Sequence, residues 1–236
     1  MSRDNKTTRE PSVLGACFYG LIMAGVGAFI GALYLASFPA LGMSNQQEAR
    51  KFIEGKEGEK IRPGEVVYFK GLRSQTAGAW EAKRVALFDG AAGSVDLSHM
   101  ELNAWLGSKF LPAGATPASG AKPNLLIIPG VPNVYIDQAI VYLSIPTELV
   151  MFGSSFDYTV ISAVKIVEVD GVNQFQMVSV NVESAGVPLV GFLGKRIVET
   201  LLQAYSGTNE FTSMRDAWAR VDSVEQTEGR VRLQLR

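Results

Sequence analysis

The feature that most constrains this chain is an uncharged segment near its beginning. Residues 11–47 contain no Asp, Glu, Lys or Arg, and residues 12–38 form an almost continuous apolar run. A bilayer core of about 30 Å requires about 20 helical residues, so this run is long enough to cross a membrane with some tilt. We therefore predict a transmembrane helix within residues 11–40, with Tyr34 and Phe38 at one membrane interface.

Small residues recur along this predicted helix. Gly27 and Gly31 form a G-x-x-x-G motif, and alanines continue the pattern at four-residue spacing. Small side chains let two helix backbones approach closely in a membrane, where dispersion and weak hydrogen bonds replace the hydrophobic driving force. We therefore expect the span to pack against an integral membrane protein or a second copy of this chain, although Gly and Ala are also common in membrane helices generally. The predicted packing residues are Gly20, Ala24, Gly27, Ala28, Gly31 and Ala32.

A cleaved signal peptide is the alternative interpretation of this segment. Ala40-Leu-Gly42 has the small residues of a cleavage site, but the apolar run is far longer than the roughly 7–15 residues of a signal h-region. Leu14-Gly-Ala-Cys17 resembles a lipoprotein box, yet it lies at the start of the run with almost no apolar stretch before it. We interpret Cys17 as a small apolar residue within the span.

The orientation of the span depends on the basic residues that flank it. Three of them precede the span and three follow it: Arg3, Lys6, Arg9, Arg50, Lys51 and Lys56. The tie is broken because residues 39–49 carry no positive charge and because long domains translocate largely regardless of charge. We expect residues 1–10 to be a cytoplasmic tail at the plasma (inner) membrane and the C-terminal domain to be periplasmic, that is, extracytoplasmic.

The rest of the chain predicts a juxtamembrane stalk over residues 41–62 and one domain over residues 63–236. The stalk mixes acidic and basic side chains, which is typical of a solvated surface. In the domain, β-prone runs lie at 65–70, 80–88, 94–97, 125–128, 134–145, 148–152, 155–168, 175–183, 219–225 and 229–234. Turn or breaker residues separate several of these runs: Pro129-Gly130, Pro146, Gly153 and Asp170-Gly171.

Two helices are expected between these strands. Ser98 and Glu101 have the spacing of a capping box, so one helix should begin there. The second should cover 189–204, and its apolar face should carry Leu189, Phe192, Leu193, Ile197 and Leu201. A Gly- and Pro-rich loop is expected at 111–124. The predicted fold class is α+β, with one mainly antiparallel sheet and two or three packing helices after the transmembrane helix.

The single Cys17 and the single His99 limit the chemistry of the chain. One cysteine excludes an intramolecular disulfide, and these counts exclude metal centres built from several cysteines or histidines. The 22 basic and 23 acidic residues nearly balance, which removes the electrostatic argument for binding nucleic acid.

Motifs that resemble catalytic sequences are incomplete. Gly191-Phe-Leu-Gly194-Lys195 lacks the spacing of a phosphate-binding loop, and Gly153-Ser-Ser155 lacks the second glycine of a nucleophile elbow. His99 follows a helix cap, where a histidine is usually a surface residue. Three acidic residues are expected on solvated strand faces: Asp137, Glu148 and Asp157. We predict no catalytic residue, no metal ligand and no cofactor, and we do not expect an enzyme.

Two short motifs lie in an order known from one family. Ser98-x-x-Glu101-Leu-Asn103-Ala-Trp-Leu106 comes early in the domain, and Gly186-Val-Pro188-Leu189 leads into the late helix. In this order, residues 95–205 resemble the YpmS-like family of uncharacterised single-pass membrane proteins. The resemblance implies an extracytoplasmic α+β domain with a curved sheet for contact with lipid or a partner, and it implies no catalytic residues. The loop at 111–124 and the Gly/Ala-rich span depart from the family pattern.

These features together predict a non-enzymatic accessory or scaffold subunit of a larger membrane protein complex. The alternative is an extracytoplasmic lipid-binding or lipid-handling protein. Residues 140–145 and 160–169 are apolar on both strand faces, so they can line a groove for an acyl chain, although an ordinary hydrophobic core explains them as well.

Overall fold

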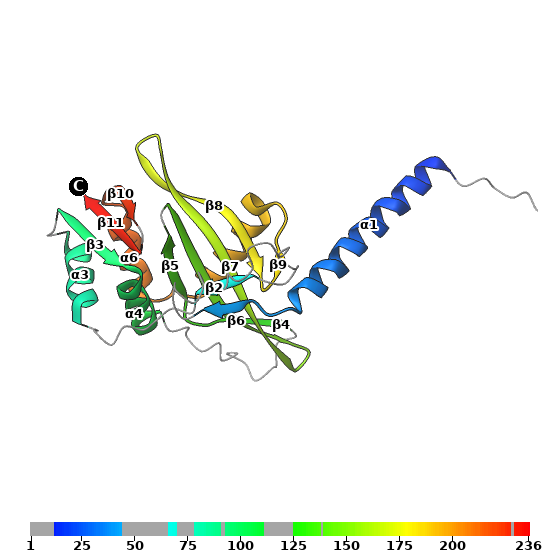
Figure 1. The fold of residues 1–236 in the computed structure, drawn as a ribbon, viewed down its shortest axis with the longest axis horizontal. Helices are drawn as coiled ribbons and strands as arrows, with labels where there is room; N and C mark the ends of the chain where they lie inside the picture. Colours follow the sequence, from blue (N-terminus) through cyan, green and yellow to red (C-terminus); the bar gives the residue numbers. More distant parts are fainter. Residues whose placement is uncertain are drawn as a thin grey trace, which may run out of the picture.

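The structure is a computed structural model in which one long helix projects from an α+β domain (Figure 1). It describes residues 12–43, 66–69, 78–90, 93–110, 125–137, 139–227 and 229–236. The predicted stalk beyond Met43 and the predicted loop at 111–124 lie outside these residues. The expected fold class, an N-terminal apolar helix followed by mainly antiparallel sheets and packing helices, is confirmed.

The projecting helix, α1, spans Val13–Ala36, inside the predicted limits of 11–40. It ends one turn before Pro39, and the chain then returns to the domain. Residues 41–43, which we expected in a stalk, form strand β1 (Leu41–Met43), which pairs in parallel with β2 (Val67–Phe69). The strand predicted at 65–70 therefore exists, and it holds the segment that follows the span.

A three-stranded antiparallel sheet lies at the end of the domain farthest from α1 (Figure 1). Its strands β3 (Ser94–Ser98), β10 (Val221–Thr227) and β11 (Arg230–Leu235) are ordered β10-β11-β3. Helices α3 (Gly78–Asp89), α4 (His99–Lys109) and α6 (Asn209–Trp218) pack on one face of it. Alternate residues of β11 are buried under these helices, and the residues between them face outward.

The larger antiparallel sheet has six strands: β4 (Leu125–Pro129), β5 (Asn133–Asp137), β6 (Ile140–Met151), β7 (Ser154–Val169), β8 (Val172–Val182) and β9 (Ala185–Gly186). The π-helix η1 (Val190–Gly194) and α5 (Lys195–Gln203) cover one of its faces, where Val198 and Leu201 pack on Val160 and Val180. Residues 159–164 of β7 are all buried, which confirms burial on two faces for that part of the run at 160–169.

The two sheets are joined through β8 and the C-terminal hairpin. The rings of Phe175 on β8 and Trp218 on α6 stack with their centroids 4.8 Å apart. Close to them, Asn173 Nδ2 donates to the carbonyl oxygen of Asp222 at 3.0 Å. These contacts connect segments that are far apart in the sequence.

The strand predicted at 80–88 is wrong, because this segment is the middle of α3. Trp80 and Leu87 are both buried, and their separation of seven residues places them on one face of a helix. Arg84 lies on the same face and reaches Glu210 of α6. The helix formers Ala, Glu, Lys and Arg between the apolar residues agree with this assignment. Helix α6 was not among the expected elements either.

Pro146 does not break a strand, as we had expected, because it lies inside β6. On one side, residues 140–144 of β6 pair with β5, and residues 147–151 pair with β4. Pro146 therefore sits where the neighbouring strand changes, a position at which no N–H is needed for the ladder. Its carbonyl oxygen still accepts a hydrogen bond from the Gly130 N–H at 2.6 Å.

A buried ion pair holds the three helices of the smaller sheet together. Glu210 of α6 accepts hydrogen bonds from Arg84 of α3 and from the indole N–H of Trp105 of α4, the latter at 2.6 Å. Trp105 is almost completely buried. Burial alone raises the pKa of Glu210, but the hydrogen bonds from Arg84 and Trp105 outweigh it and hold the pKa below its ordinary value.

We expect Glu210→Gln to lower the free energy of unfolding of the full chain in detergent by about 2–4 kcal/mol, because it leaves Arg84 without its counter-charge. Urea denaturation at pH 7 measures this change. The control is Glu225→Gln, which breaks an exposed ion pair. It should change the free energy of unfolding by less than about 0.5 kcal/mol. Equal losses in the two variants would contradict a structural role for the buried pair.

The same contact predicts a pH dependence. The pKa of Glu210 is lower in the folded chain than in the unfolded chain, so its contribution is present above the unfolded pKa of about 4.3 and is lost as pH falls through the folded pKa. Glu210→Gln removes this group from the titration. The stability difference between wild type and variant should therefore shrink on acidification, and a constant difference from pH 7 to pH 3 would refute the assignment.

Candidate membrane-facing site

Helix α1 carries all six predicted packing residues on its surface. Gly20, Ala24, Gly27 and Gly31 follow spacings of four, three and four residues, which place them on one stripe of a helix with 3.6 residues per turn. Ala28 and Ala32 lie beside that stripe. A methyl group added at Gly20, Gly27 or Gly31 would meet no atom within 4 Å. The described part of the chain therefore leaves this face of α1 uncovered.

The end of α1 is attached to the domain. Its last residues, Leu35 and Ala36, are half-buried, and the helix contacts β9. The rings of Tyr34 and Phe38 pack edge to face at 5.0 Å. Two residues farther on, the Ala40 N–H donates to Glu183 Oε2 at 2.5 Å. The foot of the helix is thus tied to the edge of the larger sheet.

Glu183 is the residue that makes this connection, and nothing in the sequence singled it out. It lies in the turn between β8 and β9 with a φ of +51°, in the left-handed region. Its Oε1 accepts a hydrogen bond from the Thr159 N–H of β7, and its own N–H donates to the Thr159 carbonyl oxygen at 2.8 Å. One buried carboxylate therefore satisfies a backbone donor on each side of the junction.

The turn that follows β9 exposes apolar side chains. The helix predicted at 189–204 exists as η1 and α5, and Leu201 is buried as predicted. Leu189, Phe192 and Leu193 were expected on the same buried face, but their exposed fractions are 72%, 64% and 39%. The wider turn of the π-helix changes the phase between this segment and α5, so these side chains point away from the core.

Gly194 sets the close approach of η1 to the sheet. A Cβ at this position would lie 2.8 Å from Val180 Cγ2, whereas a Cβ at Gly191 would meet no atom within 4 Å. The glycine therefore serves packing against β8, and the phosphate-loop-like segment has no loop structure. Lys195 lies 3.7 Å from Glu199 in an exposed ion pair on α5.

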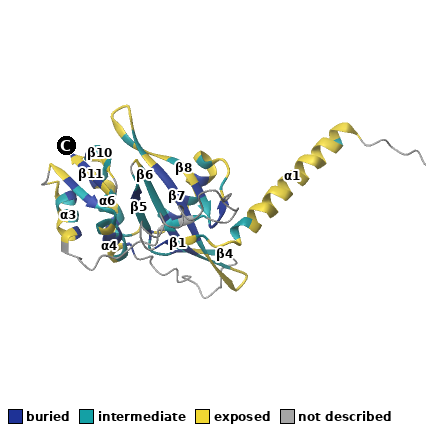
Figure 2. Cartoon of the chain, in the orientation of Figure 1, coloured by how far each residue is buried: buried dark blue, intermediate teal, exposed yellow. Residues whose placement is uncertain are grey.

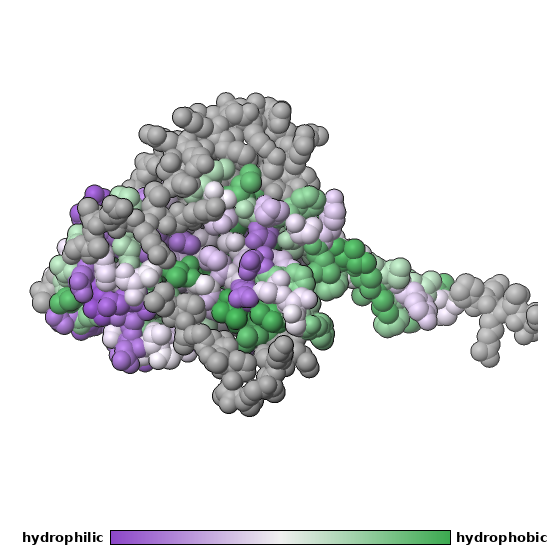
Figure 3. Space-filling view, turned by 90° about the horizontal axis from the view of Figure 1, so that it is seen from below, coloured by the Kyte–Doolittle hydropathy of each residue, from purple (hydrophilic) through white to green (hydrophobic). Residues whose placement is uncertain are grey.

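These features gather on one side of the molecule. Figure 1 shows η1 and α5, drawn in yellow to orange, on the side of the larger sheet from which α1 projects. Figure 2 shows most of α1 as exposed, and its last residues, next to the domain, are partly buried. In Figure 3 the apolar surface of α1 continues up to the junction with the domain. The exposed apolar turn and the candidate span therefore lie on the same side of the larger sheet.

His99, one of the polar residues considered for catalysis, lies in a packed environment. His99 is half-buried, its ring lies 5.2 Å from the ring of Tyr135, and its Nδ1 finds no hydrogen-bond partner among the described residues. Burial lowers the pKa of His99, and the backbone of Gly229 opposes part of this effect. The histidine is therefore a packing residue of the α4–β5 junction, more buried than the surface position we expected.

The three acidic residues on the strands do not form one cluster. Glu148 and Asp157 are directly opposite each other on β6 and β7, and Glu148 Oε1 accepts a hydrogen bond from Ser155 Oγ at 2.5 Å. Asp137 lies at the end of β5, opposite Ile140. Among the described residues, no group of three His, Cys, Asp or Glu side chains could hold a metal ion.

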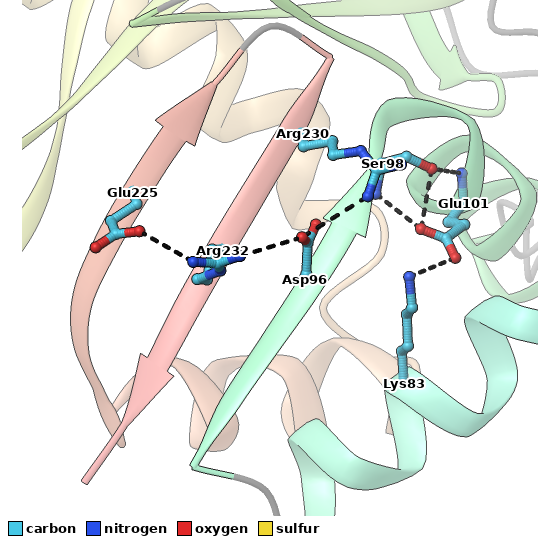
Figure 4. Close-up of polar contacts among 7 residues, drawn as sticks. All are labelled: Lys83, Asp96, Ser98, Glu101, Glu225, Arg230 and Arg232. Atoms are coloured by element: carbon cyan, nitrogen blue, oxygen red, sulfur yellow. Dashed lines mark hydrogen bonds and ion pairs between the residues drawn. The ribbon is translucent and has the colours of Figure 1, made fainter.

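Charged side chains on the outer face of the smaller sheet form a solvated network (Figure 4). Asp96 lies 3.8 Å from both Arg230 and Arg232, and Arg232 lies 3.7 Å from Glu225. Exposed pairs at these distances contribute little to stability or binding. The open face of this sheet is therefore interpreted as a solvated surface.

The predicted capping box is confirmed at the start of α4 (Figure 4). Ser98 Oγ accepts from the Glu101 N–H at 3.2 Å, and Glu101 Oε2 accepts from the Ser98 N–H at 2.8 Å. Burial raises the pKa of Glu101, but hydrogen bonds from Lys83 and Ser98 lower it by more, so the net pKa is below its ordinary value. Two residues on, Asn103 donates to the Val134 carbonyl oxygen at 2.9 Å and accepts from the Val134 N–H at 2.6 Å.

The E-L-N residues therefore cap α4 and connect it to β5, while the Gly/Pro step lies between β9 and η1. The resemblance to the YpmS-like family stays a prediction. No known family model matches the chain, and a comparison with curated proteins finds no match.

The contact of Gly194 with β8 predicts different outcomes for two alanine variants of η1. Gly194→Ala should lower the free energy of unfolding by about 1–3 kcal/mol, because its methyl group overlaps Val180. Gly191→Ala is the matched control in the same turn, and its effect should be under about 0.5 kcal/mol. Denaturation of the full chain in detergent gives both values. Similar values for the two would show that η1 is not closely packed on β8.

A graded series at Glu183 tests the junction. Glu183→Gln keeps one acceptor oxygen, whereas Glu183→Ala leaves the N–H groups of Ala40 and Thr159 without their partner, at a cost of about 1–3 kcal/mol. Hydrogen exchange at residues 37–43 should be slowest in wild type, faster in Glu183→Gln and fastest in Glu183→Ala. The exposed carboxylate variant Glu168→Ala is the control and should exchange like wild type. If hydrogen exchange at residues 37–43 is no faster in Glu183→Ala than in wild type, Glu183 does not attach this segment to the domain.

Proposed function

We propose that this protein is a non-enzymatic accessory subunit of a membrane protein complex. Within the described residues, α1 is the helix that is long and apolar enough to cross a membrane. We further propose that α1 is not cleaved and remains as a single membrane span. In this proposal it packs against another membrane helix, and the domain lies on the extracytoplasmic side.

The observation that supports the proposal is the uncovered stripe of Gly20, Ala24, Gly27 and Gly31. The described part of the chain places nothing against these residues, so the close helix approach that they allow is open to another chain. The partner is an integral membrane protein, and a second copy of the chain would use the same stripe. The flanking charges are the support for a cytoplasmic N-terminus, and the plasma (inner) membrane is part of the same proposal.

Retention of the span is supported by the junction. Cleavage after Gly42 would cut β1 and remove the segment whose Ala40 N–H binds Glu183. The folded domain therefore uses residues 40–43, and their removal would leave β2 without its parallel partner and Glu183 Oε2 without its donor. This supports a transmembrane helix over a cleaved signal peptide.

Mild-detergent purification of the full chain, followed by mass spectrometry, tests the proposal. A stoichiometric membrane protein partner, or a homo-oligomer, should accompany wild type and be lost in Gly27→Leu and Gly31→Leu, because the larger side chains separate the helix backbones. Gly25→Leu is the matched control: Gly25 is equally uncovered but lies off the stripe, so its variant should keep the partner.

Three results would contradict the proposal. Equal retention in all three variants would show that the stripe is not the contact. A monodisperse protein that carries lipid in its domain, without a partner, would support the lipid-handling alternative instead. A chain whose mass begins after Gly42 would show that the helix is a signal peptide.

A further inference from the structure

Leu189, Phe192 and Leu193 place three large apolar side chains on one exposed turn. Single exposed apolar residues are ordinary on protein surfaces, but a cluster on one turn marks a surface that meets another phase or molecule. Val190 in the same turn faces inward and packs with the core of the larger sheet. The turn is therefore divided between a side that holds it to the domain and a side that faces outward.

The position of this turn relative to α1 is fixed by contacts on the chain. β9 contacts the foot of α1, and η1 begins four residues after the end of β9. Glu183, two residues before β9, binds the segment that leaves α1. Figure 1 shows η1 on the same side of the domain as α1. If α1 crosses a bilayer, the surface next to its C-terminal end is the membrane interface.

The charges around the turn also fit a lipid surface. Lys195 and Arg196 follow η1 directly, and both are exposed. An apolar tip followed by basic side chains is the pattern of interfacial segments, in which apolar groups enter the acyl boundary and cations remain among the phosphates. Tyr34 in the last turn of α1 and Phe38 just after it form an aromatic pair at the foot of the helix, as expected at a membrane interface.

The turn is held in this arrangement before any lipid is present. Gly194 lets η1 pack directly on Val180, and Leu189 opens the turn with a φ of +51°, an unfavourable conformation for a leucine. A strained backbone at an exposed apolar residue persists only where the surrounding structure imposes it. No rearrangement is needed to present the three side chains outward.

We propose that η1 inserts Leu189, Phe192 and Leu193 into the bilayer leaflet at which the C-terminal end of α1 leaves the membrane. The inserted side chains reach about 5–10 Å into the boundary between headgroups and acyl chains. The occupant of this surface is lipid, and the domain thereby lies against the membrane with two attachments, α1 and η1. The inference rests on the proposed membrane span.

Three full-length proteins with one cysteine each test the inference. They are the native chain with Cys17 in α1, Cys17→Ala/Phe192→Cys on η1, and Cys17→Ala/Val85→Cys on α3. Residues 192 and 85 are both exposed apolar positions, so neither replacement disturbs the core, and α3 lies at the end of the domain farthest from α1 (Figure 1). Each protein is labelled with bimane and placed in phosphatidylcholine–phosphatidylglycerol vesicles.

Quenching by doxyl lipids reports contact with acyl chains, and quenching by iodide reports contact with water. Doxyl lipids should quench the label at 192 at least about threefold more than the label at 85, because only the first lies within the leaflet. Iodide should show the reverse order. The label at Cys17 should respond to doxyl lipids in the same manner as the label at 192.

Each other outcome overturns the inference. If Cys17 is quenched by doxyl lipids but 192 responds to iodide like 85, the span stands and η1 does not insert. If the label at 192 is shielded from both quenchers, protein covers the turn instead of lipid. If Cys17 is not quenched by doxyl lipids, the span itself fails, and the inference fails with it.

Discussion

The arrangement of this protein depends on one buried carboxylate. Glu183 accepts a backbone hydrogen bond from Ala40, just after the long apolar helix, and another from Thr159 in the middle of the larger sheet. Each of its two oxygens accepts from one backbone N–H, and hydrogen bonds from backbone donors to a carboxylate are stronger than neutral ones. Without it, the described residues would still join α1 to the domain through the strand pair β1–β2 and the contact with β9.

This junction determines where the surrounding surface of the domain lies relative to α1. Because α1 contacts β9, the π-helix η1 begins only four residues after the strand on which the helix rests. Gly194 then fixes η1 on β8 by a contact that tolerates no Cβ, and the wide turn directs Leu189 and Phe192 outward. An exposed apolar turn would be a liability elsewhere on a domain surface. Beside the proposed membrane span, lipid is the proposed partner of the same turn, which connects the proposed anchoring with the proposed insertion.

Local signals predicted the elements whose residues interact over short distances. The capping box of Ser98 and Glu101 and the turn at Asp170-Gly171 both form, since each depends on neighbours in the chain. The segment at 80–88 is a helix and not the predicted strand, and this outcome depends on Trp80 and Leu87 packing in a common core with distant segments. Pro146 could be placed inside a strand only once the change from β4 to β5 beside it was known.

The sequence by itself determined the apolar span, its stripe of small residues, the α+β class and the limits that one cysteine and one histidine place on the chemistry. These properties follow from the composition of the chain and from the spacing of residues along it. The tertiary structure alone decided that Glu183 binds Ala40, that Asn103 joins α4 to β5 and that η1 faces outward beside α1. Each of these depends on residues brought together from distant segments, and a hydrogen bond or a close packing contact has no signature in the spacing of a single strand or helix.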